Sequence, residues 1–410
     1  MKIRSITFFL NPGWPLNDKL ITHAEAFIKD ARGTFQSAGY DIQTTRLATV
    51  PFSFLFKSEV LDPLLNFSLA IEAAANSAGF DYVSIGPALP DRPEFYPCIY
   101  DILKSTENVF VSGLITNNRG EISFMAINAC AELIVKTAKI VADGFANLRF
   151  AALANVPPGT PFFPAAYHEY SDNDVQPAFG LAMEAADIFN ESVHNSDGLT
   201  EIRRSIINKL ESNSRTLEEI SNSLSHKYRV RFTGMDFTPA PFPVRSLSFG
   251  TAIEDLGVSS IGLHGSLAAA AFFADAIDRA RFRRAGFNGL FFPVLEDLTL
   301  AMGVESGSIN IKDLLMYSTV CGSGLDTIPL PGDTQPDELY ALLLDIAFLA
   351  QRLDKPLTAR LMPIPGKKAG DMTEFSFDYF VNSKVMCIEG KPIRGFLRDG
   401  NLIGIHKRSN

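Results

Sequence analysis

Two hydrophobic patterns alternate along the first part of the chain. Short runs of β-branched and aromatic residues predict buried strands, and longer stretches with apolar residues about every 3.6 positions predict helices. The run Ile3–Leu10 predicts a first strand. The stretch Asp18–Ala38 predicts a helix, for which Gly39 is a natural C-terminal stop. The unit repeats, with strands expected at 41–47, 82–85, 109–115 and 149–154 and helices at 61–78, 94–104 and 126–142.

The middle of the chain departs from this alternation. Residues 178–191 and 199–225 predict two helices with little strand between them, and the second is rich in Arg, Glu, Asn and Ser. We therefore expect residues 195–225 to form a helical excursion outside the core. Alternation then resumes, with strands expected at 229–237, 289–294, 358–362 and 384–388 and helices at 267–280, 311–319 and 337–353.

Such alternation predicts a parallel sheet with helices on its faces. No linker interrupts it, so we expect residues 1–410 to form one α/β domain. The count of roughly nine or ten strands suits a large barrel or a long open sheet.

Composition narrows the class of protein. Hydrophobic residues make up 46% of the chain and charged residues 20%, which predicts a sizeable core. The formal net charge of -9 argues against nucleic acid as a partner. No apolar stretch reaches the roughly 20 residues that a membrane span needs. The 4 cysteines are few for this length, which favours a reducing compartment, and we expect a cytoplasmic protein.

Loops rich in proline and glycine follow many of the predicted strands. The first one, Leu10–Trp14, carries no glycine-rich dinucleotide motif. Stiff loops can hold side chains for binding, although each could also be only a sharp turn. The others stand at 86–90, 155–161, 236–241, 293–297, 329–333 and 363–368.

The segment Cys321–Thr327 is the most informative of these regions. A cysteine that follows an apolar helix enters two glycines, Gly322 and Gly324, and then an aspartate. The glycines would let backbone amides approach a ligand, and a thiol there could act as a nucleophile if its pKa were lowered. The alternative is an inert, buried cysteine beside a turn.

Carboxylates in the loops are further candidates. Two neighbouring carboxylates could divide acid and base roles or hold a divalent metal. The alternative is helix capping, above all for Glu296 and Asp297 ahead of an apolar helix. The candidates are Asp236, Glu254, Glu296, Asp297, Asp326 and Asp333.

Basic residues near the same loops could balance an anionic substrate. Arg360, Lys367 and Lys368 are candidates for this role, although lysines are often only solvated surface charges. His264 precedes Gly265 at the start of an Ala-rich helix, where it could serve as a base or an anion donor, or be a structural histidine.

The run Cys321–Asp333, with the sequence CGSGLDTIPLPGD, resembles the signature of an uncharacterised family, domain-of-unknown-function family 711. The resemblance extends to residues 289–297, 235–254 and 359–371 and to Arg46-Leu47 with Pro51. It implies a fold similar to the ten-stranded α/β barrel of ribonucleotide reductase and pyruvate formate-lyase. By analogy, Cys321 takes the place of the cysteine that becomes a thiyl radical in those enzymes. The tail 391–396 departs from their Arg-Val-x-Gly type of motif, which argues against radical chemistry.

These observations predict a ten-stranded α/β barrel that acts on a small anionic metabolite at its mouth. We expect Cys321, Asp326 and Glu296 to be catalytic and assign no metal ligand and no cofactor. The alternative is a non-catalytic protein that binds or senses a small molecule. We also expect a homodimer formed through the apolar helices at 267–280 and 339–353. The predicted substrate-binding residues are Asp236, Arg360, Lys367 and His264.

Overall fold

A single large sheet organises the molecule. The computed structural model describes residues 1–56, 61–171, 175–320, 323–398 and 400–408. The described strands of this sheet follow the order β8-β7-β1-β2-β3-β4-β6-β10-β9. They are β1 (Lys2–Leu10), β2 (Ile42–Thr49), β3 (Tyr82–Ala88), β4 (Val109–Leu114), β6 (Phe150–Ala154), β7 (Ala178–Glu184), β8 (Arg231–Asp236), β9 (Gly324–Pro331) and β10 (Leu357–Ile364).

The sheet is mostly parallel, as the alternation of strands and helices predicts. Strands β1, β2, β3, β4 and β6 run parallel to one another. The pairs β7/β8 and β9/β10 are also parallel within themselves. Two antiparallel contacts, β1 with β7 and β6 with β10, join these three groups.

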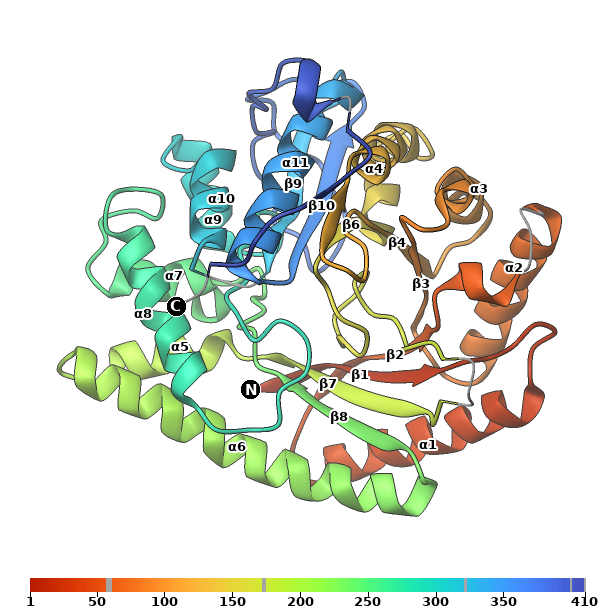
Figure 1. Cartoon of the computed structure of the whole chain (residues 1–410). Coiled ribbons are helices and arrows are strands. Elements are labelled where there is room, and N and C mark those ends of the chain that lie inside the picture. Colours follow the sequence, from red (N-terminus) through yellow and green to blue (C-terminus); the bar gives the residue numbers. More distant parts are fainter. Residues whose placement is uncertain (57–60, 172–174, 321–322, 399, 409–410) are drawn as a thin grey trace.

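Helices cover the outer face of the sheet. Figure 1 shows α1 and α6 beneath β1, β7 and β8, and α2, α3, α4 and α11 around β3, β4, β6 and β10. The α-helices are α1 (Asp18–Ser37), α2 (Leu61–Ser77), α3 (Cys98–Ser105), α4 (Phe124–Thr137), α5 (Ala186–His194), α6 (Leu199–Tyr228), α7 (Phe249–Asp255), α8 (Ser266–Arg279), α9 (Leu298–Ser306), α10 (Ile311–Ser318) and α11 (Pro336–Leu353). Short 3-10 helices are η1 (Phe52–Leu55), η2 (Pro93–Phe95), η3 (Phe145–Arg149), η4 (Arg245–Leu247) and η5 (Gly395–Leu397).

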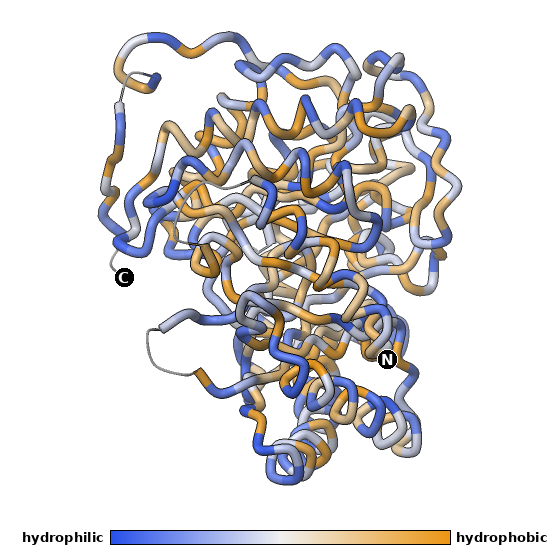
Figure 2. The backbone as a smooth tube through the Cα atoms, turned by 90° about the vertical axis from the view of Figure 1, so that its right-hand side faces the viewer, coloured by the Kyte–Doolittle hydropathy of each residue, from blue (hydrophilic) through white to orange (hydrophobic). Residues whose placement is uncertain are grey.

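The two faces of the sheet differ in character. On the outer face, apolar strand residues pack against the helices; Phe8 of β1, for example, contacts Phe27 of α1 at a ring separation of 5.0 Å. Figure 2 shows hydrophobic positions concentrated in the interior. Because side chains alternate along a strand, the neighbours of these residues face the other way.

The inner face carries several hydroxyl groups, and a loop crosses it. Thr7 of β1 donates a hydrogen bond to the carbonyl of Pro161 (2.8 Å), and Ser84 of β3 donates one to the carbonyl of Ala166 (2.7 Å). Both acceptors belong to the connection between β6 and β7, so this loop lies inside the curve of the sheet. It satisfies polar groups that an apolar interior would leave unpaired.

The described residues form the expected mostly parallel α/β sheet but show no closed ten-stranded barrel. The described sheet has nine strands and is open between its edges, β8 and β9. Residues 289–294, predicted to be a strand, are irregular: Pro293 makes one isolated bridge with Asp326 of β9, and Arg284 makes one with Met235 of β8. Proline has no N–H for a ladder, and the chain turns after it into α9. The segment 284–294 therefore contacts both edges without completing a strand.

Three other assignments from the sequence also need correction. The first part of the predicted helix 178–191 is strand β7, because pairing between β1 and β8 outweighs the helix propensity of its small residues. Strand β9 was not predicted, since Pro329 and Pro331 argue against a strand; both are tolerated because β9 is an edge. Residues 384–388 form no strand beyond one bridge from Met372 to Lys384.

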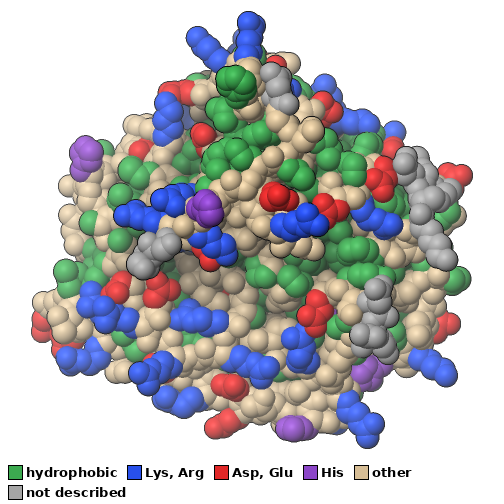
Figure 3. Space-filling view, in the orientation of Figure 1, with side chains coloured by type: hydrophobic (Ala, Val, Ile, Leu, Met, Phe, Trp, Pro, Cys, Tyr) green, Lys and Arg blue, Asp and Glu red, His purple; other side chains and the backbone are tan. Residues whose placement is uncertain are grey.

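Helix α6 and the C-terminal segment complete the surface. Helix α6 contains most of the predicted excursion and buries Ile206, Leu210 and Leu217, in contact with α1, α5, α8 and β8. Near the C-terminus, β11 (Leu402–Gly404) pairs antiparallel with β5 (Glu121–Ser123). Figure 3 shows basic and acidic side chains interspersed on one face. No helix in the described part of the chain is long and apolar enough to cross a membrane.

Candidate functional site

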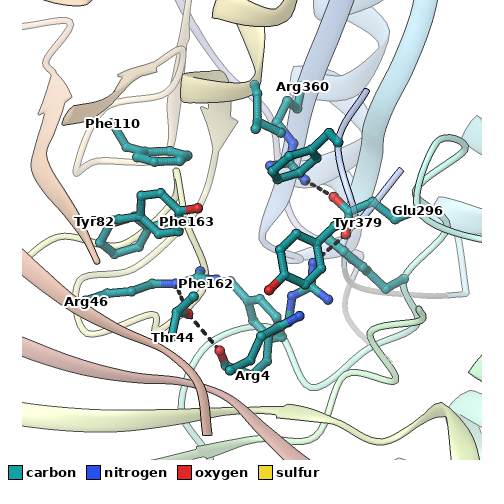
Figure 4. A pocket seen from close by; sticks show the side chains of 14 residues that line it. Arg4, Thr44, Arg46, Tyr82, Phe110, Phe162, Phe163, Glu296, Arg360 and Tyr379 are labelled. Carbon is teal, nitrogen blue, oxygen red and sulfur yellow. Dashed lines mark hydrogen bonds and ion pairs between the residues drawn. The ribbon is translucent and has the colours of Figure 1, made fainter. Parts of the chain in front are cut away.

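A pocket opens on the concave face of the sheet. It comprises about 590 Å³ when the open solvent at its mouth is included, but only about 60 Å³ is free for the centres of water-sized spheres, so the enclosed part of the pocket is small. Five strands contribute to its wall: β1, β2, β3, β4 and β10, through Arg4, Thr44 and Arg46, Tyr82, Phe110, and Arg360. Figure 4 shows these side chains converging from opposite sides of one space.

Aromatic rings form much of the pocket wall. Phe110 packs edge-to-face against Tyr82 (5.2 Å between ring centroids) and against Phe163 (5.4 Å). Phe162 and Phe291 stack on each other at 5.8 Å. Phe377 and Tyr379 enter from the C-terminal segment. Such a lining favours an apolar or flat ligand body.

A chain of ion pairs lies on the opposite wall. Arg360 donates two hydrogen bonds to Asp326, from Nε (2.5 Å) and Nη2 (2.7 Å), and one from Nη2 to Glu296 (2.8 Å). Arg4 Nη2 donates to the second oxygen of Glu296 at 2.5 Å. All four residues are largely buried, and Glu296 and Asp326 expose about 4% of their side chains. The two carboxylates therefore already hold two guanidinium groups.

β-Bulges aim these side chains. The pairing of β1 with β7 shifts register between Ile3 and Ser5, around Arg4. The pairing of β10 with β9 shifts between Ala359 and Leu361, around Arg360. A bulge re-aims a side chain that strict alternation would place on the other face. Opposite Arg360, the residue after Asp326 is Thr327, which has a positive φ of 45°, a strained conformation for a β-branched residue.

Arg46 on β2 differs from the other two pocket arginines. Its Nε donates to the hydroxyl of Thr44 (2.9 Å), which in turn donates to the carbonyl of Arg4 (2.8 Å). Its guanidinium lies 5.2 Å from the ring centroid of Phe163 and 5.9 Å from that of Tyr82. Within the described part of the chain, no carboxylate forms an ion pair with it, although it is only 8% exposed.

The environments of these groups shift their pKa values in different directions. Burial, together with the positive charges of Arg4 and Arg360, lowers the pKa of Arg46 to about 9, so it remains charged at neutral pH. For Arg360, burial acts to lower the pKa, but Asp326 and Glu296 outweigh it and raise the pKa above its ordinary value. Burial raises the pKa of Asp326, although Arg360 opposes the shift.

Two of the sequence-predicted residues, Glu296 and Arg360, line the pocket, and a third, Asp326, lies behind the lining and holds Arg360. Asp236 is fully buried but does not line the pocket. Its carboxylate accepts N–H groups from Thr238 (3.0 Å), Phe287 (2.6 Å) and Asn288 (3.0 Å) and the hydroxyl of Thr238 (2.6 Å), which joins two loops. Burial raises its pKa despite these bonds.

The helix-capping alternative applies to Asp297 alone. Its carboxylate accepts from the backbone N–H groups of Thr299 and Leu300 at the start of α9, and from the hydroxyl of Ser248. Glu296, one residue earlier, points instead into the pocket and caps nothing. Glu254 accepts the backbone N–H of Ile261, which gives it a structural contact.

The remaining predicted residues lie elsewhere. His264 is exposed in the turn that precedes α8. Lys367 pairs with Glu374 (3.0 Å) in the loop after β10 and does not line the pocket. Cys321, the predicted catalytic thiol, lies outside the described residues. Nearby, Gly324 has a φ of +87°, and a Cβ there would lie 2.2 Å from the carbonyl oxygen of Thr358, so β9 can begin only with glycine.

The sequence patterns did not predict that Arg4, Arg46 and several aromatic residues line the inner face of the sheet. Arg46 was named only as part of the family resemblance, although a charged residue between Thr45 and Leu47 in a predicted buried strand is itself unusual. Arg4 also lies in a predicted strand, but strict alternation would place it on the same outer face as Ile6 and Phe8, and only the bulge turns it inward. The inward aromatic residues resemble core residues in the sequence.

Comparison with known proteins identifies the family of this chain. The model of the family described as "Uncharacterised ACR (DUF711)" matches residues 1–379. The chain belongs to the DUF711 family. Similar DUF711 relatives are named UPF0210 protein. One from Halothermothrix orenii is 28% identical over 374 residues, covering 87% of this chain and 82% of the relative. Another, from Methanococcoides burtonii, is 27% identical over 372 residues with the same coverage of both chains.

The family assignment confirms the resemblance carried by the Cys321–Asp333 run. A third UPF0210 protein, from Acetivibrio thermocellus, is 27% identical over 402 residues and covers 94% of this chain and 88% of its own. None of these names states a reaction or a ligand. The pocket of this DUF711 protein is therefore the basis for proposing a function.

Proposed function

We propose that this protein binds a small organic anion in the concave pocket and that Arg46 holds the anionic group. The observation that carries the proposal is a buried guanidinium with no carboxylate partner in the described chain, at the wall of a pocket. A buried charge is costly unless an opposite charge and hydrogen bonds compensate it. Guanidinium groups match carboxylate and phosphate oxygens well, so an anionic ligand would supply that compensation.

The sequence prediction of an acid/base role for Glu296 and Asp326 has weaker support. Both carboxylates accept hydrogen bonds from arginines, which favours a role in positioning those arginines. Binding or sensing of a metabolite is therefore our first proposal. Catalysis is the second, because a raised pKa, as at Asp326 behind the pocket residue Arg360, is a feature of many catalytic groups.

A relation to the barrel of ribonucleotide reductase and pyruvate formate-lyase remains part of this proposal. Two features support it: the curved sheet has its helices outside (Figure 1), and residues 161–166 of the connection between β6 and β7 lie against its inner face. A radical role for Cys321 would need its own evidence, such as an electron paramagnetic resonance signal that Cys321→Ser abolishes.

The binding proposal can be tested with a thermal-shift screen of small carboxylates, phosphates and sulfonates. Arg215 is exposed on α6, so Arg215→Met is a control with the same change of charge and shape. Anions that raise the melting temperature of the parent and of Arg215→Met should not raise that of Arg46→Met.

The affinity of Arg46→Met for the best anion should fall at least about 30-fold, since breaking a buried charge pair costs about 2 kcal/mol or more. Circular dichroism would check that this variant is folded. Equal affinity of the parent and Arg46→Met would refute the proposal. Mass analysis of the anion after incubation with the protein would then separate binding from turnover.

A further inference from the structure

The charges around the pocket limit the charge of its ligand. Three guanidinium groups, those of Arg4, Arg46 and Arg360, line the pocket with one carboxylate, that of Glu296, and a second carboxylate, that of Asp326, pairs with Arg360 behind the lining. Each carboxylate is already shared with Arg4 or Arg360, so Arg46 contributes one uncompensated positive charge. A ligand with one negative charge would balance it. A dianion would leave a second negative charge buried beside Glu296, which is unfavourable.

The position of Arg46 limits the shape of the ligand. Its guanidinium packs near the rings of Phe163 and Tyr82, and Phe110 closes against both of these rings. An anion bound to the terminal nitrogens of Arg46 would therefore have aromatic rings beside it. Ring faces and edges favour the offset or edge-to-face packing of another ring over a branched polar body.

Two phenol groups face the same space. Figure 4 shows Tyr379 standing between Arg46 and the Glu296–Arg360 pair. Within the described chain, neither Tyr379 nor Tyr82 makes a side-chain hydrogen bond with its hydroxyl to another residue. A hydroxyl can donate to the second oxygen of a carboxylate that Arg46 holds. The site thus offers a cation, phenol donors and an aromatic wall.

We infer that the ligand is an aromatic monocarboxylate, with its carboxylate on Arg46 and its ring against Phe110 and Phe163. This inference rests on the proposed binding of an anion and specifies its class. It also explains why Arg4 and Arg360 are paired with Glu296 and Asp326: their pairing leaves a single positive charge for the ligand. A phosphate-bearing ligand would require a second free cation in the pocket.

Calorimetric titration with simple probes can test this class. Benzoate should bind at least about tenfold more tightly than acetate, because its ring adds apolar contact area. It should also bind at least about tenfold more tightly than the neutral benzamide and the dianionic phenyl phosphate, and several-fold more tightly than the saturated cyclohexanecarboxylate. Each comparison changes one property: the ring, the charge, the aromaticity or the number of charges.

Variants of the pocket wall test whether the preference for an aromatic carboxylate depends on Phe110. Phe110→Leu should weaken benzoate binding several-fold, up to about tenfold, and leave acetate binding unchanged. The control is Phe272→Leu, because Phe272 lies on α8 and does not line the pocket. Arg46→Met should abolish binding of both carboxylates. Thermal unfolding of each variant confirms that it is folded before titration.

The outcomes separate the two levels of the proposal. If acetate or phenyl phosphate binds through Arg46 as tightly as benzoate does, the aromatic monocarboxylate is excluded and anion binding stands. The same conclusion follows if cyclohexanecarboxylate equals benzoate or if Phe110→Leu has no effect. If no anion binds the parent protein, both proposals fail.

Discussion

Two buried arginines lie on opposite walls of one pocket, and the protein compensates their charges in different ways. Arg360 makes three hydrogen bonds to Asp326 and Glu296, and its pKa is raised by them. Arg46 makes one, to a neutral hydroxyl, and its pKa falls to about 9. Both are more than nine-tenths buried. The protein compensates the charge of Arg360 within its own chain, and our proposal assigns the compensation of Arg46 to a ligand.

A third buried basic group, His168, avoids the cost of a buried charge in another way. Burial, helped by the positive charge of Arg231, lowers its pKa to about 4, so at neutral pH it is simply uncharged. Its ring stacks against Phe9 at 6.3 Å. Histidine can avoid the cost of burial by losing its proton, whereas arginine retains its charge at neutral pH. This is why Arg46, and not His168, points to an anion.

The largest effect is expected from substitution of the paired arginine. Arg360→Met should lower the free energy of unfolding by about 3–5 kcal/mol, because it leaves two buried carboxylates with one fewer cation between them. Arg46→Met, which removes a charge that no carboxylate compensates, should change it by less than about 1 kcal/mol. Urea titrations of the two variants measure both values.

Arg360→Lys provides the control, since it keeps the charge but not the forked hydrogen bonds, and should recover part of the loss. The contrast between the two arginines would disappear if Arg46→Met proved as unstable as Arg360→Met. In that case Arg46 would have a structural partner, and the case for a ligand would weaken.

His168 should give a smaller, pH-dependent effect. The unfolded chain binds a proton at this residue near pH 6.5, but the folded chain does so only near pH 4. Stability is therefore fully present above about pH 6.5 and is lost as the pH falls towards 4, by about 3 kcal/mol. His168→Phe keeps a ring beside Phe9 but cannot titrate.

Urea titrations of the parent and His168→Phe between pH 4 and 7.5 would measure this difference, and other titrating groups cancel in it. The gap between the two curves should narrow or reverse at low pH in favour of the variant. Parallel curves over the whole range would mean that His168 titrates normally in the folded protein.

Sequence patterns predict the outer half of this fold better than the inner half. Strands such as Ile3–Leu10 and the helices that cover them follow from apolar periodicity, because each buries one clear face. The sheet order, the two antiparallel contacts and the open edge depend on pairings between distant segments. Local propensity does not encode these pairings, and β7 shows the consequence.

The candidate site was predictable only in part, for the same reason. The Pro/Gly-rich loops led to Glu296, the glycine-containing segment Cys321–Thr327 led to Asp326, and the search for basic residues near the loops led to Arg360; the structure brings all three together. Arg4 reaches the pocket only because of a bulge, which the sequence does not reveal. Polar and aromatic residues on an inward strand face resemble ordinary core positions until the sheet curves around them.

The smallest effect, and a direct test of a sequence-based candidate, concerns Asp236. Its carboxylate accepts four hydrogen bonds in a fully buried position, so Asp236→Asn would turn an NH₂ group towards at least one N–H donor. The free energy of unfolding should fall by about 1–3 kcal/mol. Binding of an anion in the pocket should be unchanged, because Asp236 does not line it.

Asp333→Asn is the matched control, since Asp333 is exposed in a similar Pro/Gly-rich loop and should lose almost nothing. Urea titration and calorimetry on the same preparations give both quantities. If Asp236→Asn instead kept its stability and lost the anion, Asp236 would contact the ligand after all. The distinction matters because a carboxylate that joins two loops and one that binds a substrate can both be buried and have a raised pKa. They differ in where their hydrogen-bond partners lie: in the protein's own loops or in the pocket.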